Sequence, residues 1–146
     1  MLVVFGAFFR WLYRGSLLET KKAITKDQAG AQRKLLSRLY LFADAKGIPA
    51  LGNAEINQFH KIMTARWEFP TLTMDYLYEN TPTYSPIRVY LVDFFIGTAG
   101  PQKNVTSKLD CINHPDFLKA AIVASVSKDP DAVPLRCQNY WRAIDV

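Results

Sequence analysis

Apolar side chains recur at helical spacing along this 146-residue chain, and that periodicity limits the possible folds more than any other feature. The clearest example follows Ser85-Pro86, where a good N-cap residue precedes a proline suited to the first helical turn. Its apolar positions fall three and four residues apart: Ile87, Tyr90, Leu91, Phe94 and Phe95. Strand-like alternation is nearly absent. The sequence therefore predicts a mainly α fold with little or no β-sheet.

Glycine and proline punctuate these patterns and predict where the helices end. Gly15-Ser16 is expected to end the first helix, and residues 17–30 are expected to form a polar connector. Gly47 is expected to end the next helix, just before a corner at Ile48-Pro49. The expected helices cover residues 3–13, 31–46, 49–66, 72–78 and 86–97. A further helix is expected from Pro115, capped by Asn113 or His114 and ended by Asp129-Pro130-Asp131. A last short helical piece is expected within 135–146. Residues 67–70 break the pattern, and residues 100–113 are expected to form a polar loop.

The same periodicity predicts which side chains face inward. In the helix at 31–46 the inward set is Leu35, Leu36, Leu39, Tyr40, Phe42 and Ala43, and the outward set is Arg33, Lys34, Ser37, Arg38 and Asp44. In the helix at 49–66 the inward set is Ile56, Phe59, Ile62 and Met63. After Pro115 it is Phe117, Leu118, Ala121 and Ile122. Helices that follow one another so closely are expected to pack as hairpins.

Composition agrees with a globular domain and limits the partners. Hydrophobic residues make up 49% of the chain and charged residues 21%, and no apolar run reaches the ~20 residues of a membrane helix. The net charge of +5 is concentrated in the first half, which we interpret as a solvated basic surface. The apolar N-terminus has no basic residue before it, unlike a secretory signal. We therefore expect an intracellular protein, cytoplasmic or nuclear, with no membrane association.

Residues capable of catalysis are few and scattered. Cys111 and Cys137 have no metal-binding spacing, and His114 is better explained as a helix cap than as the partner of a nucleophile. His60 is expected to lie off the apolar face of its helix, in solvent. Asp residues on both sides of Pro130 are typical of a turn. The sequence therefore predicts no enzyme, no cofactor and no metal site.

Three segments, taken in order, resemble the BTB/POZ family, especially its fungal members. FFRWLYRG at residues 8–15 resembles an F-x-x-W-L-Y-x-G stretch late in that domain. LYLFADAKGIPALGNA at 39–54 resembles the helix and corner that come next. YENTPTYSPIRVYLVD at 78–93 is similar to a signature that follows the domain in fungal members. The resemblance implies helical hairpins like those of the C-terminal half of the BTB/POZ fold, with a helical extension.

In the family a helix and a three-stranded sheet precede the first of these segments, whereas only seven residues precede it here. We therefore expect the back half of the domain in residues 1–67, the fungal-type extension in 68–99, and a loop with a helical tail in 100–146. The family forms homodimers and binds cullin-type ligase scaffolds, largely through the preceding part. Neither role is expected to be intact in this chain, and Met1 is in doubt as the natural start.

The resulting hypothesis is a non-enzymatic protein–protein interaction module, possessing an apolar first helix that would have lost its sheet. An apolar helix face without its usual cover is expected to bind a partner. The candidate interaction surface consists of Val4, Phe5, Phe8, Phe9, Trp11 and Tyr13. The alternative is a small basic helical protein that binds nucleic acid through its first half. A steep salt dependence of DNA affinity would distinguish this alternative from the first hypothesis.

Overall fold

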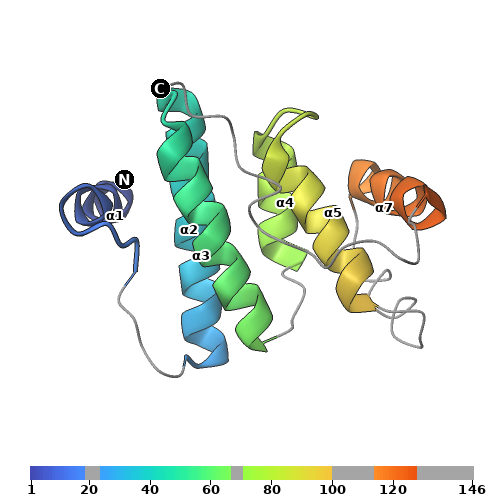
Figure 1. The fold of residues 1–146 in the computed structure, drawn as a ribbon, viewed down its shortest axis with the longest axis horizontal. Coiled ribbons are helices and arrows are strands. Elements are labelled where there is room, and N and C mark those ends of the chain that lie inside the picture. Colours follow the sequence, from blue (N-terminus) through green and yellow to red (C-terminus); the bar gives the residue numbers. More distant parts are fainter. Residues whose placement is uncertain (19–23, 67–70, 100–113, 128–146) are drawn as a thin grey trace. The chain divides into compact units, whose positions relative to one another are not determined.

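The computed structural model describes residues 1–18, 24–66, 71–99 and 114–127, and all regular structure within them is helical (Figure 1). The helices are α1 (Leu2–Arg14), α2 (Lys26–Lys46), α3 (Pro49–Arg66), α4 (Thr71–Asn80), α5 (Pro86–Ala99) and α7 (Pro115–Ser127). The prediction of a mainly α protein is confirmed, since no strand occurs among the described residues. None of the helices in these ranges is long and apolar enough to cross a membrane. The chain divides into two compact units, one holding α1–α3 and the other α4, α5 and α7.

The first unit is built on the hairpin of α2 and α3, which lie side by side. Gly47 ends α2 with a φ of 64°, a left-handed conformation that glycine adopts without steric cost. Its N–H and that of Ile48 donate to carbonyls of the last turn of α2, Ile48 to Ala43 at 2.9 Å. The predicted corner is therefore confirmed. Gly15, with a φ of 67°, ends α1 in the same way.

The N-terminus of α2 lies earlier than the periodicity predicts. The helix begins at Lys26, not near Ala31, so the predicted connector at 17–30 is wrong over its last residues. A capping box explains the difference: Thr25 Oγ1 accepts from the Gln28 N–H at 3.2 Å, and Gln28 Oε1 accepts from the Thr25 N–H at 3.0 Å. These two bonds satisfy backbone donors at the helix start and stabilise a polar first turn that makes no apolar stripe.

The buried face of α2 is wider than predicted. Leu36, Leu39 and Tyr40 are buried as expected, but so are Arg33 and Ser37, which the periodicity assigned to solvent. Because both α1 and α3 pack on α2, its buried arc exceeds a single stripe. Ser37 tolerates burial because its hydroxyl donates to the Arg33 carbonyl at 2.7 Å. On α3 the full predicted inward set is buried.

The second unit buries the five predicted apolar positions of α5. α4 continues through Asn80, past its expected end at Tyr78, whereas α5 ends at Ala99, close to its expected end near Gly97. The Asn80 side-chain amide donates to the Tyr76 carbonyl at 2.8 Å, and this bond stabilises the last turn of α4. α7 begins at Pro115, as predicted, with Asp116 in its first turn. Ile122 was expected to face inward, but it is largely exposed.

Several expectations concern segments outside the described residues. They are the break at 67–70, the polar loop at 100–113, the stop at 129–131 and the short helical piece within 135–146.

Candidate interaction surface

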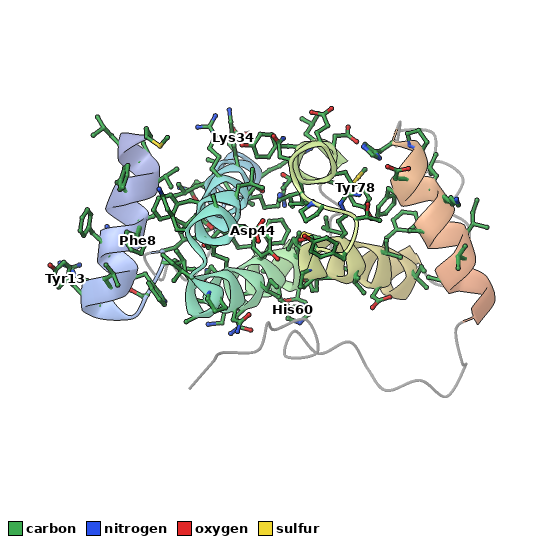
Figure 2. All side chains as sticks on the ribbon, turned by 90° about the horizontal axis from the view of Figure 1, so that it is seen from above. Phe8, Tyr13, Lys34, Asp44, His60 and Tyr78 are labelled. Carbon is green, nitrogen blue, oxygen red and sulfur yellow. The ribbon has the colours of Figure 1, made fainter. Side chains whose placement is uncertain are left out.

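α1 is held on α2 by an aromatic cluster centred on Phe42. The rings of Phe5 and Phe8 lie 5.5 and 5.3 Å from that of Phe42, in edge-on and tilted arrangements that aromatic pairs favour. Val4 and Ala7, one turn apart, are buried on the same side of the helix. Figure 2 shows Phe8 between α1 and α2. This side of α1 is therefore an ordinary packing face.

The opposite side of α1 is also apolar, and it is open to solvent. Leu2, Phe9 and Tyr13 expose 88%, 51% and 83% of their surface, and Figure 2 shows Tyr13 directed away from α2. The Phe9 and Tyr13 rings stack at 6.4 Å, one above the other along the helix. We define the outer face of α1 as Leu2, Phe5, Phe9, Leu12 and Tyr13, spaced at three and four residues. α1 is therefore apolar on two sides, and its two arginines lie on the arc between them.

The structure separates the sequence-predicted surface residues into two groups. Val4 is buried on the packing side, and Phe8 and Trp11 are half-buried with their rings 6.3 Å apart. The others, Phe5, Phe9 and Tyr13, belong to the outer face, although Phe5 also contacts Phe42 at its edge.

The prediction did not include Leu2 and Leu12, which complete the outer face. A signal for them was present in the sequence. Leu2 and Leu12 lie at helical spacing from Phe5 and Phe9 and so extend a second apolar stripe on the other side of the helix.

No charged side chain interrupts the outer face. α1 contains no acidic residue, and its two arginines, Arg10 and Arg14, lie outside the stripe by helical spacing. Gly6 lies at the edge of the outer face, one turn from Leu2 and Phe9 and also one turn from Val3 and Arg10. A Cβ added at Gly6 would meet no atom within 4 Å, so packing inside the unit does not require a glycine there. The outer face is therefore apolar and uncharged, with Arg10 and Arg14 beside it.

A second cluster, in the other unit, joins three helices around Tyr78. This buried residue of α4 lies 5.0 Å from the His114 ring and 5.6 Å from the Phe117 ring of α7. The Arg88 guanidinium of α5 lies 4.4 Å above the Tyr78 ring, within the range of a cation–π contact. A tyrosine, a histidine and an arginine at such distances could suggest a catalytic site.

The hydrogen bonds of this cluster favour a structural role. Arg88 donates through Nη2 to the carbonyls of Tyr78 and Thr81 and through Nε to the Thr81 hydroxyl at 3.0 Å. Thr81 in turn donates to the Leu77 carbonyl at 2.5 Å. These carbonyls end α4 and lack partners within the helix. Arg88 thus caps α4 from α5, and this contact explains the spacing of the motif at residues 78–93.

Burial raises the pKa of Tyr78 to about 12, with the nearby Asp116 carboxylate adding to the rise and Arg88 opposing it. A phenol with that pKa keeps its proton at neutral pH and cannot act as a base. The Tyr78 hydroxyl donates to the Arg88 carbonyl at 3.5 Å. The cluster is therefore organised to join α4, α5 and α7.

The remaining candidates for chemistry are spread over the two units. His60 of α3 is half-buried, not fully solvated as predicted, and burial lowers its pKa below the usual 6.5. His114 lies in the other unit and precedes α7, where its carbonyl accepts from the Leu118 N–H at 3.1 Å. Cys111, Cys137, Asp129 and Asp131 lie outside the described residues. Within the described ranges no group of three His, Cys, Asp or Glu could hold a metal ion.

Comparison with known proteins finds no relative: no family model, no curated protein and no solved structure matches the chain. The function is therefore argued from the surface of α1.

Proposed function

We propose that this chain is a non-enzymatic protein–protein interaction module that docks partners on the outer face of α1. The observation that carries the proposal is a continuous, uncharged apolar stripe on a helix whose other side is already packed. Exposing such a stripe to water has a free-energy cost that a partner removes by covering it.

The size of the face supports a binding role. With ~200 Å² for each large residue, the exposed fractions of its five residues sum to roughly 600 Å² of surface, which includes backbone and the Tyr13 hydroxyl. The largest apolar patch on a typical monomer covers about 300–600 Å² and is often functional. The apolar part of the outer face therefore falls within that range. Elsewhere among the described residues the exposed apolar side chains are fewer on each helix, such as Leu72 and Tyr76 on α4 and Ile122 and Val123 on α7.

The resemblance to BTB/POZ proteins points in the same direction. Its motifs occupy structural positions in this chain: Gly47 and Ile48 make the α2–α3 corner, and Arg88 caps α4. Residues of that kind suit a scaffold that presents surfaces to other proteins. We infer an adaptor-like module of BTB/POZ type.

Site-specific photo-crosslinking in the source cells tests the proposal. A photoreactive residue replaces Phe9, on the outer face, and in a matched control it replaces Lys34, an exposed position on α2. We expect defined protein adducts from position 9 that are absent from position 34. Adding Leu2→Asp, at the far end of the face, should abolish them, because a charge there must be desolvated on docking.

The proposal fails if position 9 yields no more protein adducts than position 34. It also fails if Leu2→Asp leaves the adducts unchanged, because the contact would then not involve the outer face.

A further inference from the structure

We propose that the partner docks as an acidic amphipathic helix, with apolar side chains on the outer face of α1 and carboxylates beside Arg10 and Arg14. The inference rests on the proposed function, because it names the chemistry of the segment that covers the same surface. Three observations carry it: the charge at the edges of the outer face, the exposed charge of the surrounding unit, and the length of the face.

The two edges of the outer face differ in charge. By helical spacing, Arg10 follows the face on one edge, one turn from Tyr13, and the exposed Arg14 lies one turn beyond Arg10. On the other edge the residue of α1 is Phe8, which is uncharged and packs against Phe42. Because α1 contains no acid, a partner gains attraction only where its carboxylates lie along the arginine edge. This charge complementarity also determines how the partner is oriented.

The exposed charge of the first unit favours an acidic partner as well. Among its described residues the acids are few: Asp27 is exposed, Asp44 is half-buried and Glu55 is buried. The exposed cations outnumber them: Arg14, Lys26, Lys34, Arg38, Lys46 and Lys61. A surface of this sign speeds the encounter with an acidic segment and slows the encounter with a basic one.

The length of the outer face suits a single short helix. From Leu2 to Tyr13 the face extends about 16 Å, at a rise of 1.5 Å per residue. A helix of about three turns covers this length with apolar side chains three and four residues apart. Addition of a β-strand has no template, because no strand occurs among the described residues. Even complete coverage of the roughly 600 Å² buries no more than about 1,200 Å² in total, so we expect a reversible complex.

An anionic membrane is the competing occupant, since it also combines an apolar layer with negative charge. A helix that lies in a membrane surface has a polar, charged side opposite its apolar side. In α1 the side opposite the outer face is apolar and packs on α2, and the arginines lie along one edge. This arrangement favours a protein segment with a defined acidic edge, and anionic vesicles become one arm of the test.

Fluorescence anisotropy of two labelled synthetic peptides with the purified full chain tests the inference. Both are amphipathic helices of about 18 residues with the same leucine stripe, and the stripe is flanked by glutamates in one peptide and by lysines in the other. We expect the glutamate peptide to bind about 10-fold or more tightly at physiological salt. Leu2→Asp should weaken its binding about 10-fold or more. Leu72→Asp, at a matched exposed leucine in the first turn of α4, should change it less than about 2-fold.

Arg14→Glu tests the arginine edge, and Lys61→Glu makes the same charge change at an exposed position on α3. We expect Arg14→Glu to weaken the glutamate peptide about 5-fold or more and to strengthen the lysine peptide by a similar factor. The gain for the lysine peptide would also show that the variant folds. Lys61→Glu should change either affinity less than about 2-fold, because salt screens charges beyond ~8 Å. Equal effects of the two substitutions would overturn the pairing at the arginine edge.

The two proposals fail in different ways. Equal affinity for the two peptides, or no binding of either, overturns the acidic helix, while crosslinks to a protein from position 9 still support the interaction module. A crosslinked partner segment that mass spectrometry shows to lack acids overturns the acidic helix as well. Cosedimentation with phosphatidylserine vesicles that Leu2→Asp abolishes, without binding of the glutamate peptide, assigns the outer face to a membrane and overturns both proposals. A chain that binds neither peptides nor vesicles and gives no protein crosslinks also overturns both.

Discussion

Tyr78 is a buried phenol at the junction of three helices, and its ionisation links the stability of the second unit to alkaline pH. Its pKa is about 12 in the folded protein, against a usual value of 10.0. The folded chain therefore holds this proton more tightly than the unfolded chain does. Stability from this group is fully present below pH 10 and is lost as the pH rises through about 12.

We therefore predict that Tyr78→Phe reduces the loss of stability between pH 10 and 12, because phenylalanine has no proton to lose. Urea unfolding midpoints measured across this interval would show a shallower decline than in the wild type. Tyr84→Phe is the matched control, since Tyr84 is 85% exposed and should leave the decline unchanged. Equal declines for wild type and Tyr78→Phe would contradict the prediction.

At the scale of elements, Arg88 joins the end of α4 to the first turn of α5. Its guanidinium donates hydrogen bonds to two carbonyls and one hydroxyl and lies over one aromatic ring. We predict that Arg88→Met lowers the free energy of unfolding by about 2–3 kcal/mol, because buried carbonyls lose a charged donor. Methionine keeps much of the apolar stem, so the loss reports the polar contacts more than the packing.

Urea denaturation measures this difference, and Arg38→Met is its control. Arg38 is exposed on α2, and replacing it should change stability by no more than about 0.5 kcal/mol. A similar effect of the two substitutions would show that Arg88 does not act as a cap.

The same scale shows what the sequence could and could not predict. The bounds of α3 and the five buried apolar positions of α5 follow from apolar spacing, although α5 also buries Arg88 and Val92 between α4 and α7. On α2 the apolar stripe also understates the buried face. Neighbours on two sides bury Arg33 and Ser37, and no local pattern reports how many helices will pack on a given one. Its early start depends on the side chains of Thr25 and Gln28, a capping signal that apolar periodicity does not detect.

The candidate surface was predictable as a helix but not as a face. α1 carries one stripe through Val4 and Phe8 and another through Leu2 and Phe9, and both are apolar. Periodicity alone cannot choose between them. The position of Phe42 on α2 decides the matter, since its ring is the surface against which one stripe packs. The functional hypothesis therefore needed tertiary structure to identify which residues remain exposed.

At the scale of the whole molecule, the net charge of +5 is not gathered into one exposed cationic surface among the described residues, as binding of a polyanion would require. Arg33 and Arg88 are buried. The exposed cations of the first unit's described residues are spread over three helices: Arg14, Lys26, Lys34, Arg38, Lys46 and Lys61. Among these described cations, Lys34 and Arg38 lie one turn apart on α2. This distribution favours the interaction module over the nucleic-acid alternative.

We accordingly predict no saturable binding of a fluorescent DNA duplex at physiological salt, as measured by fluorescence anisotropy. At low salt, weak binding through Lys34 and Arg38 should show a slope of log affinity against log salt near about −2, because two phosphates are neutralised. Replacing both residues with glutamate should remove that residual binding. Leu2→Asp should not affect it by more than its single charge, because the outer face of α1 is uncharged. Saturable binding at physiological salt with a much steeper slope would instead favour a nucleic-acid-binding protein, since only a larger cationic surface neutralises that many phosphates.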